Sequence, residues 1–188
     1  MLNLSEKSQI IKLAELTLES LFKPEKKHEV EKQRKIVEKL GLNNGVFVTL
    51  LKKGELRGCI GYITPVKEFS RLLIDATISS ATRDPRFDPL KKEELDEIEI
   101  EVSILSEPKK ISSIAEIEVG KHGIIVRRGP YQGLLLPQVA VEHRWDKLTF
   151  LQHTCIKAGL HPNDYRKEDT EIYVFTAEVF SKSDLKGL

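Results

Sequence analysis

Two β-rich runs separated by a short turn, residues 46–51 and 56–63, constrain the fold more than any other feature of the sequence. The residues between them include Gly54 and can reverse the chain, so the two runs predict a β-hairpin. The returning run contains Leu56-Arg57-Gly58-Cys59-Ile60-Gly61, in which a cysteine lies between two glycines. Glycine weakens a strand interior and often marks a β-bulge or the close approach of another backbone or a ligand. This stretch is therefore the first candidate for a functional site.

Helical patterns lie on both sides of this hairpin. Apolar residues three and four apart over residues 6–22, after the candidate N-cap Ser5, predict an amphipathic helix, and a similar pattern predicts another over 68–81. The charged segment 25–40 predicts an exposed helix or a solvated connector. Alternation of apolar and polar residues over 97–105 predicts a half-buried strand. We expect the hairpin and this strand to share one sheet covered by the two amphipathic helices.

Shorter elements are predicted beyond Pro108. They are strands at 117–119, 124–126 and 131–136, a helix over 147–158 and a last β-rich run at 172–180. We expect this last run to rejoin the first sheet. Hairpins and helices without regular βαβ alternation predict an α+β fold, an antiparallel sheet covered by helices with a second, smaller α+β part packed against it. The larger part is placed at 1–108 with 169–188 and the smaller part at 109–168, together forming one unit.

Composition excludes several classes of protein. A net charge of +1 gives no basic surplus for nucleic acid, which makes nucleic acid an unlikely partner without excluding a local basic patch. The two cysteines have no paired Cys or His spacing, so neither a disulfide scaffold nor a structural zinc site is indicated, and no cofactor is expected. The N-terminus has no signal-peptide pattern and no apolar run reaches the roughly 20 residues of a membrane span, so we expect a cytoplasmic protein that does not bind membranes. Abundant Lys and Glu are typical of a thermophilic source.

Three residues are candidates for catalysis. Cys59 can act as a nucleophile if Arg57 or a histidine lowers the pKa of its thiol; the alternative is a small buried side chain. His122, in a turn beside Gly123, is either a base or a hydrogen-bond partner within that turn. Glu101, on the polar face of its strand, is either an acid/base group or a surface residue. A metal site that combines Cys59 with distant histidines is a further alternative, although the ligand spacing of such sites is absent.

The other cysteine and a glutamine are weaker candidates for a functional site. Cys155 lies at an apolar helical position and is predicted to be buried. Gln138, within the core-and-turn run 133–140, could offer its side-chain amide to a ligand.

Three arginines indicate an anion-binding site. Arg83 and Arg86 share a short loop with Asp84, and Arg57 stands beside Cys59 in the glycine-containing strand. A guanidinium binds phosphate or carboxylate through two parallel hydrogen bonds, or it braces the loop against a carboxylate of the protein.

Gly58 and Gly61 would leave room for a ligand near the backbone. We therefore predict a pocket for a small anionic or nucleotide-like ligand where residues 57–61 and 83–88 meet. Full pairing of both Arg57 and Arg86 to protein carboxylates would refute this pocket, and so would the lack of a melting shift with millimolar nucleotide or phosphate.

Several stretches between about residues 45 and 160 resemble motifs of the AMMECR family in their order and their amino-acid sequence. They are Gly45-Val46-Phe47-Val48-Thr49-Leu50, Leu56-Arg57-Gly58-Cys59-Ile60-Gly61, Asp84-Pro85-Arg86-Phe87, Glu101-Val102-Ser103, Gly120-Lys121-His122-Gly123, Gly133-Leu134-Leu135-Leu136-Pro137-Gln138-Val139-Ala140 and Lys157-Ala158-Gly159-Leu160. Tyr165 stands where such proteins often carry tryptophan. The resemblance implies a two-part α+β fold, a cytosolic protein common in archaea, and an unsettled activity. It also implies a Memo-like protein and a radical SAM enzyme as candidate partners, because relatives occur beside their genes.

Two functions are compatible with these residues. In the first, the protein is an enzyme in which an arginine binds an anionic substrate and Cys59 attacks it. In the second, it is a non-catalytic ligand-binding or adaptor module in which the glycines allow tight backbone packing and Cys59 is inert. The two differ in whether Cys59 is reachable from solvent and has a basic partner within hydrogen-bond reach.

Overall fold

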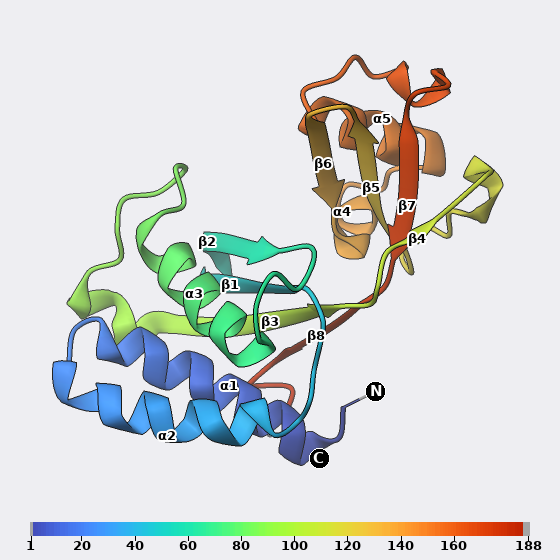
Figure 1. The fold of residues 1–188 in the computed structure, drawn as a ribbon. Coiled ribbons are helices and arrows are strands. Elements are labelled where there is room, and N and C mark those ends of the chain that lie inside the picture. The colour runs from blue at the N-terminus through green and yellow to red at the C-terminus, as the bar shows by residue number, and fades with distance from the viewer. Residues whose placement is uncertain (1, 186–188) are drawn as a thin grey trace. The chain divides into compact units, whose positions relative to one another are not determined.

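A computed structural model describes residues 2–185 and confirms the α+β fold (Figure 1). By internal contacts the chain divides into two compact units. The first unit holds the residues up to Leu105 and those from Glu178 onward, and the second unit is Ser106–Ala177. The second unit is therefore inserted between two parts of the first.

The first unit is built on a four-stranded sheet with the strand order β2-β1-β3-β8. Its strands are β1 (Val46–Lys52), β2 (Glu55–Tyr62), β3 (Ile98–Leu105) and β8 (Ala177–Ser181). The central strand β1 pairs antiparallel with both β2 and β3. The predicted hairpin and the predicted strand over 97–105 thus share one sheet, as expected.

Helices α1 (Leu4–Ser20) and α3 (Phe69–Thr82) supply the apolar cover of this sheet. In Figure 1, α3 lies across β1 and β2, and α1 packs against α3 and β3. Alternate residues of β1, among them Val48 and Leu50, are fully buried against these helices. The predicted cover of the sheet is therefore confirmed.

The charged segment folds as the helix α2 (Lys27–Glu38), which packs against α1. The N-cap of α1 is Asn3 and not Ser5, because Asn3 Oδ1 accepts a hydrogen bond from the Glu6 backbone N–H and the Glu6 carboxylate accepts one from the Asn3 N–H. Short 3₁₀ turns complete both units: η1 (Pro24–Lys26), η2 (Lys92–Glu97), η3 (Ile114–Glu116) and η4 (Asp164–Arg166).

The second unit is a smaller four-stranded sheet with the order β4-β7-β5-β6. Its strands are β4 (Lys109–Lys110), β5 (Gly123–Arg128), β6 (Tyr131–Leu135) and β7 (Glu171–Phe175), and its helices are α4 (Pro137–Glu142) and α5 (Lys147–Lys157). Phe150, Leu151 and Cys155 of α5 pack with Ile124 and Val126 of β5 in a separate core. The predicted strands at 124–126 and 131–136 and the predicted helix over 147–158 are confirmed.

Two predictions about strands are wrong. The run 172–180 does not rejoin the first sheet as one strand: β7 pairs with β4 and β5 of the second unit, and only β8 belongs to the first sheet. Thr176 marks the break: its carbonyl accepts the Ser106 backbone N–H, and its own N–H donates to the Ser106 hydroxyl. Residues 169–177 are therefore part of the second unit instead of the larger part. Residues 117–119 are not a strand: they lead into a turn at 119–121, and Glu118 O accepts the backbone N–H groups of Lys121 and His122.

Candidate functional site

The glycine-containing stretch forms the edge strand β2, and it carries a β-bulge. Leu50 of β1 lies opposite Gly58, whereas the next residue, Leu51, lies opposite Leu56. Arg57 is therefore the extra residue of the bulge, without a partner in β1. The bulge interrupts the regular alternation of side chains between the two faces of the sheet. The bulge that the two glycines indicated is present, one residue before Gly58.

At both glycines, protein backbone occupies the space where a side chain would lie. A Cβ atom on Gly58 would lie 2.1 Å from the carbonyl oxygen of Ser80 in α3, and one on Gly61 would lie 2.3 Å from the carbonyl oxygen of Val46 in β1. Real Cβ atoms do not approach so closely, so any side chain would force the backbone apart. The glycines therefore allow tight packing of β2, and the expectation that they leave room for a ligand is wrong.

A serine from α3 enters the hydrogen-bond ladder between β1 and β2. Val48 and Ile60 are opposite residues, but Ile60 N–H donates to the Ser80 hydroxyl (2.8 Å), which donates in turn to Val48 O (2.7 Å). The hydroxyl thus joins the helix to both strands of the hairpin. Sequence reasoning missed this contact, because Ser80 is one of several buried serines and threonines of α3 and nothing in the sequence distinguishes it from the others.

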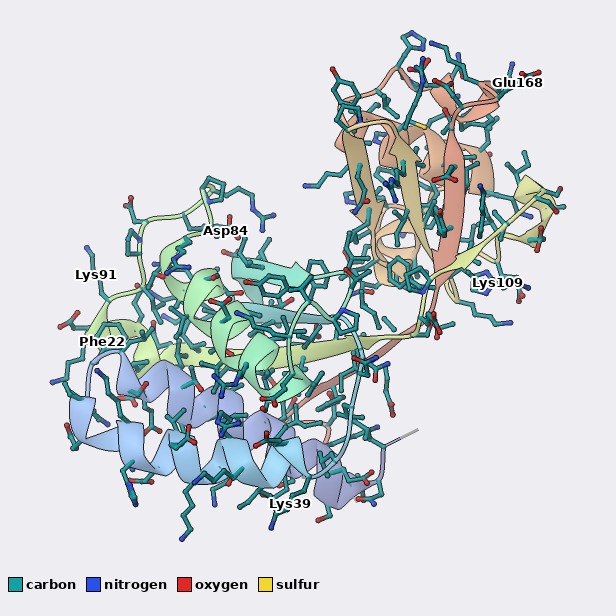
Figure 2. The ribbon with its side chains drawn as sticks, viewed as in Figure 1. Phe22, Lys39, Asp84, Lys91, Lys109 and Glu168 are labelled. Carbon is teal, nitrogen blue, oxygen red and sulfur yellow. The ribbon has the colours of Figure 1, made fainter. Side chains whose placement is uncertain are left out.

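Asp84 fixes the outer edge of the same strand. It follows the end of α3, as Figure 2 shows, and its side chain is 2% exposed. Its carboxylate accepts the Cys59 backbone N–H (2.8 Å) and the Nε and Nη2 donors of Arg86 (3.0 and 2.7 Å). The Arg86 guanidinium, with these backbone bonds, lowers the pKa of Asp84 to about 2. A buried carboxylate thus occupies the edge of β2 at Cys59.

Arg57 is paired more completely than Arg86. Its Nε and Nη2 donate to the two carboxylate oxygens of Glu94 in η2 (3.1 and 2.9 Å), and its Nη1 donates to Asp88 O (3.0 Å). The pKa of Glu94 falls to about 2, chiefly because of the hydrogen bonds from Arg57. The Phe87 ring lies near both guanidiniums, 5.9 Å from Arg57 and 5.4 Å from Arg86.

Both arginines are therefore braced by protein carboxylates. Arg57 donates from all three of its nitrogens, whereas Arg86 donates from two and its side chain is 50% exposed, so the pairing of Arg86 is not full and the anion pocket stays a prediction. Arg83 is 68% exposed and stands 4.0 Å from Asp75. Weakly paired and solvated, it does not form such a pocket by itself.

Cys59 is half-buried and belongs to a row of side chains that crosses the sheet. Thr49 of β1 lies opposite Cys59 on one side and opposite Glu101 on the other, so the three side chains share one face. The Thr49 hydroxyl donates to the Cys59 sulfur (3.3 Å). Burial raises the pKa of the Cys59 thiol; the Thr49 hydroxyl and Arg86 oppose this rise, and the charges of Asp84 and Glu101 add to it. The partner at the sulfur is a hydroxyl instead of an imidazole, and burial keeps the thiol protonated.

The remaining candidates lie in the second unit. His122 Nδ1 accepts the Glu118 backbone N–H (3.2 Å) within its own turn. Gln138 is half-buried at the start of α4. Cys155 is fully buried, as predicted, and burial raises the pKa of its thiol. His153 stacks on Trp145 at 3.9 Å between ring centroids.

The described residues exclude two further features. No group of three or more His, Cys, Asp or Glu side chains within residues 2–185 is placed to hold a metal ion. No helix in this part of the chain is long and apolar enough to cross a membrane.

Comparison with known proteins gives consistent matches over most of the chain. The family model described as AMMECR1 matches residues 11–180. Protein MK0488 of Methanopyrus kandleri is 49% identical over 174 residues, which cover 85% of this chain and 84% of that protein. A Methanothermobacter thermautotrophicus protein is 55% identical over 142 residues, 72% of this chain and 74% of its own length. The crystal structure of the uncharacterized protein PH0010 from Pyrococcus horikoshii matches with a TM-score of 0.77 and 38% identity, over 95% of this chain and 92% of that one.

Proposed function

The chain belongs to the AMMECR1 family, and we propose that it is a non-catalytic binding module that works with partner proteins. The state of Cys59 carries this proposal. A thiol acts as a nucleophile through its thiolate, and a protein prepares it by placing a base or a cation beside it. At Cys59 the hydrogen-bond donor is a threonine hydroxyl, and burial raises the pKa of the thiol more than the hydroxyl and the nearby Arg86 lower it.

The surrounding motif supports the same function. The backbone of Ser80 occupies the space beside Gly58, and that of Val46 occupies the space beside Gly61. A carboxylate of the protein pairs with each of the arginines Arg57 and Arg86. Glu101, a neighbour in the same row, adds a negative charge that disfavours a thiolate. Each of these contacts stiffens β2 and its loop. A rigid surface is what a binding module presents to a partner.

The resemblance of the sequence makes a Memo-like protein and a radical SAM enzyme the candidate partners. Mixing the purified full chain with each of them, followed by size-exclusion chromatography, tests this association. Cys59→Ala should bind each partner as well as the wild type does, because the thiol takes no part.

Thiol labelling separates the module from an enzyme. The labelling rates of Cys59 in Cys155→Ala and of Cys155 in Cys59→Ala should both be lower at pH 7 than that of free cysteine, because the thiolate is the reactive form. The rate at Cys59 should rise when the pH increases from 7 to 9. Labelling of Cys59 at pH 7 faster than free cysteine would refute the module and favour a tuned nucleophile.

A further inference from the structure

One edge of the second sheet has hydrogen-bonding groups that point away from the sheet. Among the described strands, β6 pairs with β5 alone, at the end of the order β4-β7-β5-β6 (Figure 1). The two-residue turn Gly129-Pro130 joins these strands, so Arg128 and Tyr131 are the hydrogen-bonded pair that closes the hairpin. Bonded pairs alternate along an antiparallel ladder, so the backbone N–H and C=O groups of Gln132 and Leu134 point away from β5.

This edge of β6 is regular and uncharged. Within residues 2–185, no side chain or loop makes a hydrogen bond to the outward backbone groups of Gln132 and Leu134. Open strand edges are usually protected by charges, prolines, bulges or short length. The sequence of β6, Tyr131-Gln132-Gly133-Leu134-Leu135, has no charge and no proline, and its register with β5 has no shift.

The other edge strands of the two sheets carry protective features. β2 has a bulge, and the Asp84 carboxylate accepts its Cys59 N–H. β4 is two residues long, and both are lysines. In β8, the Ser181 N–H donates to the Asp184 carboxylate. The edge of β6 is therefore the exception, and an extended chain can pair with it.

The position of α5 decides what kind of chain fits. A Cβ atom on Gly133 would lie 2.4 Å from the backbone nitrogen of Ala158, so the end of α5 lies directly over β6. If two copies paired antiparallel through β6, a two-fold axis perpendicular to the sheet would place both α5 ends on one face, over strands about 4.8 Å apart. Packed helices need about 8–10 Å between their axes. A second copy does not fit, whereas a segment without a helix on that face does.

Two side chains on the α5 face define the chemistry of such a segment. Tyr131 and Gly133 are alternate residues of β6 on this face, and Tyr131 is 54% exposed. The carbonyl carbon of Lys157 would lie 2.7 Å from a Cβ atom on Gly133. The Lys157 side chain is exposed, and no carboxylate in the described part of the chain pairs with it. Its four-carbon stem is long enough to bring the ammonium over a strand about 5 Å beyond β6.

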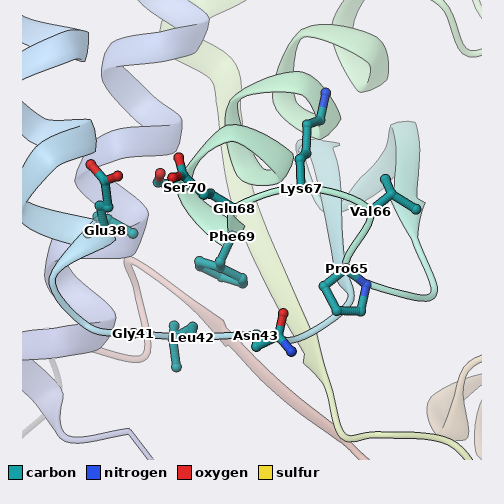
Figure 3. A pocket seen from close by; sticks show the side chains of 11 residues that line it. Glu38, Gly41, Leu42, Asn43, Pro65, Val66, Lys67, Glu68, Phe69 and Ser70 are labelled. Atoms are coloured by element: carbon teal, nitrogen blue, oxygen red, sulfur yellow. The ribbon is translucent and has the colours of Figure 1, made fainter.

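The pocket between α2 and α3 is a weaker candidate for binding (Figure 3). Its two carboxylates, Glu38 and Glu68, already pair with arginines at 2.9 and 3.0 Å. The Ser70 hydroxyl is buried and does not reach the pocket surface. None of these three groups is therefore available to a ligand.

We propose that β6 binds an extended segment of a partner protein as a fifth strand of the second sheet. The backbone of Gln132 and Leu134 exchanges hydrogen bonds with the segment. An apolar side chain of the segment packs on Tyr131, and an Asp or Glu two positions away pairs with Lys157. This inference rests on the proposed function, because it names the surface through which the binding module holds its partner.

Selection from a phage-displayed library of random peptides, with the full chain as bait, tests the edge. Gln132→Pro removes one outward N–H and leaves the ladder with β5 intact, because an edge strand tolerates proline where the N–H faces solvent. Gln132→Thr is the matched control, because it keeps this N–H. Peptides selected on the wild type should carry an apolar and an acidic residue two positions apart. They should bind Gln132→Thr as the wild type and Gln132→Pro at least about tenfold more weakly.

Two further measurements guard against misfolding of the proline variant. A melting curve checks its fold, and Lys157→Ala, which leaves the strand unchanged, should weaken binding of the selected peptides several-fold. In the wild-type complex, amide hydrogen exchange at Gln132 and Leu134 should slow, because the peptide then holds both N–H groups.

A lack of enriched peptides would overturn the proposal, and so would equal binding by Gln132→Pro or unchanged exchange at both amides. Labelling of Cys59, which tests the module itself, does not involve β6. Fast labelling would therefore refute the module alone, and a failed selection with slow labelling would refute the β6 edge alone.

Discussion

Replacing Asp84 by Asn should destabilise the first unit by roughly 2–4 kcal/mol. The lower part of this range follows from the pKa of Asp84, which folding lowers from 3.8 to about 2. At 1.36 kcal/mol per pKa unit, that shift corresponds to about 2.4 kcal/mol at pH 7. The upper part reflects the amide group of Asn, which would point a donor at either the Cys59 N–H or the Arg86 guanidinium.

The effect should depend on pH. Because folding lowers the pKa of Asp84, the stabilisation from its charge is complete above about pH 4 and is lost as the pH falls toward 2. Between pH 7 and pH 3 the difference in unfolding free energy between the wild type and Asp84→Asn should therefore shrink by roughly 1 kcal/mol. Asp88→Asn is the control, since Asp88 is an exposed residue of the same loop, and it should change stability by less than about 0.5 kcal/mol.

Urea denaturation followed by far-ultraviolet circular dichroism measures the change. The single tryptophan, Trp145, lies in the second unit, so its fluorescence follows that unit separately. Amide hydrogen exchange gives a local measurement: Cys59, whose N–H is held by Asp84, should exchange faster in the variant than Ile60, whose N–H is held by Ser80. A loss below about 0.5 kcal/mol, or the same loss at pH 7 and pH 3, would refute the role assigned to Asp84.

Two shorter predictions concern the same region. Gly58→Ala should lower the free energy of unfolding, measured by urea denaturation, by more than about 2 kcal/mol, because its Cβ would meet the Ser80 backbone. The control Gly129→Asn, at a left-handed glycine in open space, should lower it far less, and equal losses would contradict the steric argument. Millimolar phosphate or ATP should leave the melting temperature of the wild type unchanged, because Arg57 and Arg86 already bind carboxylates; a rise that Arg57→Ala and Arg86→Ala abolish would support the anion pocket instead.

The sequence predicted those elements whose periodicity decides them. The hairpin and the strand over 97–105 follow from alternation, and the helices over 6–22 and 68–81 follow from their apolar faces. The break at Thr176 was missed because β7 and β8 are both β-rich and directly adjacent, so their composition does not show that they enter different sheets.

The bulge at the candidate site could be predicted from the sequence, but the contacts around it could not. Glycines and a bulge can be read from a short stretch, because they are local features. The partner of Arg57 is Glu94, 37 residues later, and the group that fills the space at Gly58 belongs to Ser80. Tertiary folding alone brings such residues together, and a sequence without aligned relatives contains no signal that identifies them.

The insertion of the second unit affects the order in which the chain can fold during synthesis. Strand β8 is the outer neighbour of β3, yet Ser106–Ala177 must leave the ribosome before it does. At about 5–20 residues per second, these roughly 70 residues take about 4–14 s, during which β3 is an unprotected edge strand. Exposed edges pair with other chains. The nascent protein therefore passes through a window of seconds in which the second unit can fold to completion, while the first unit is complete apart from one strand and open to association with another chain.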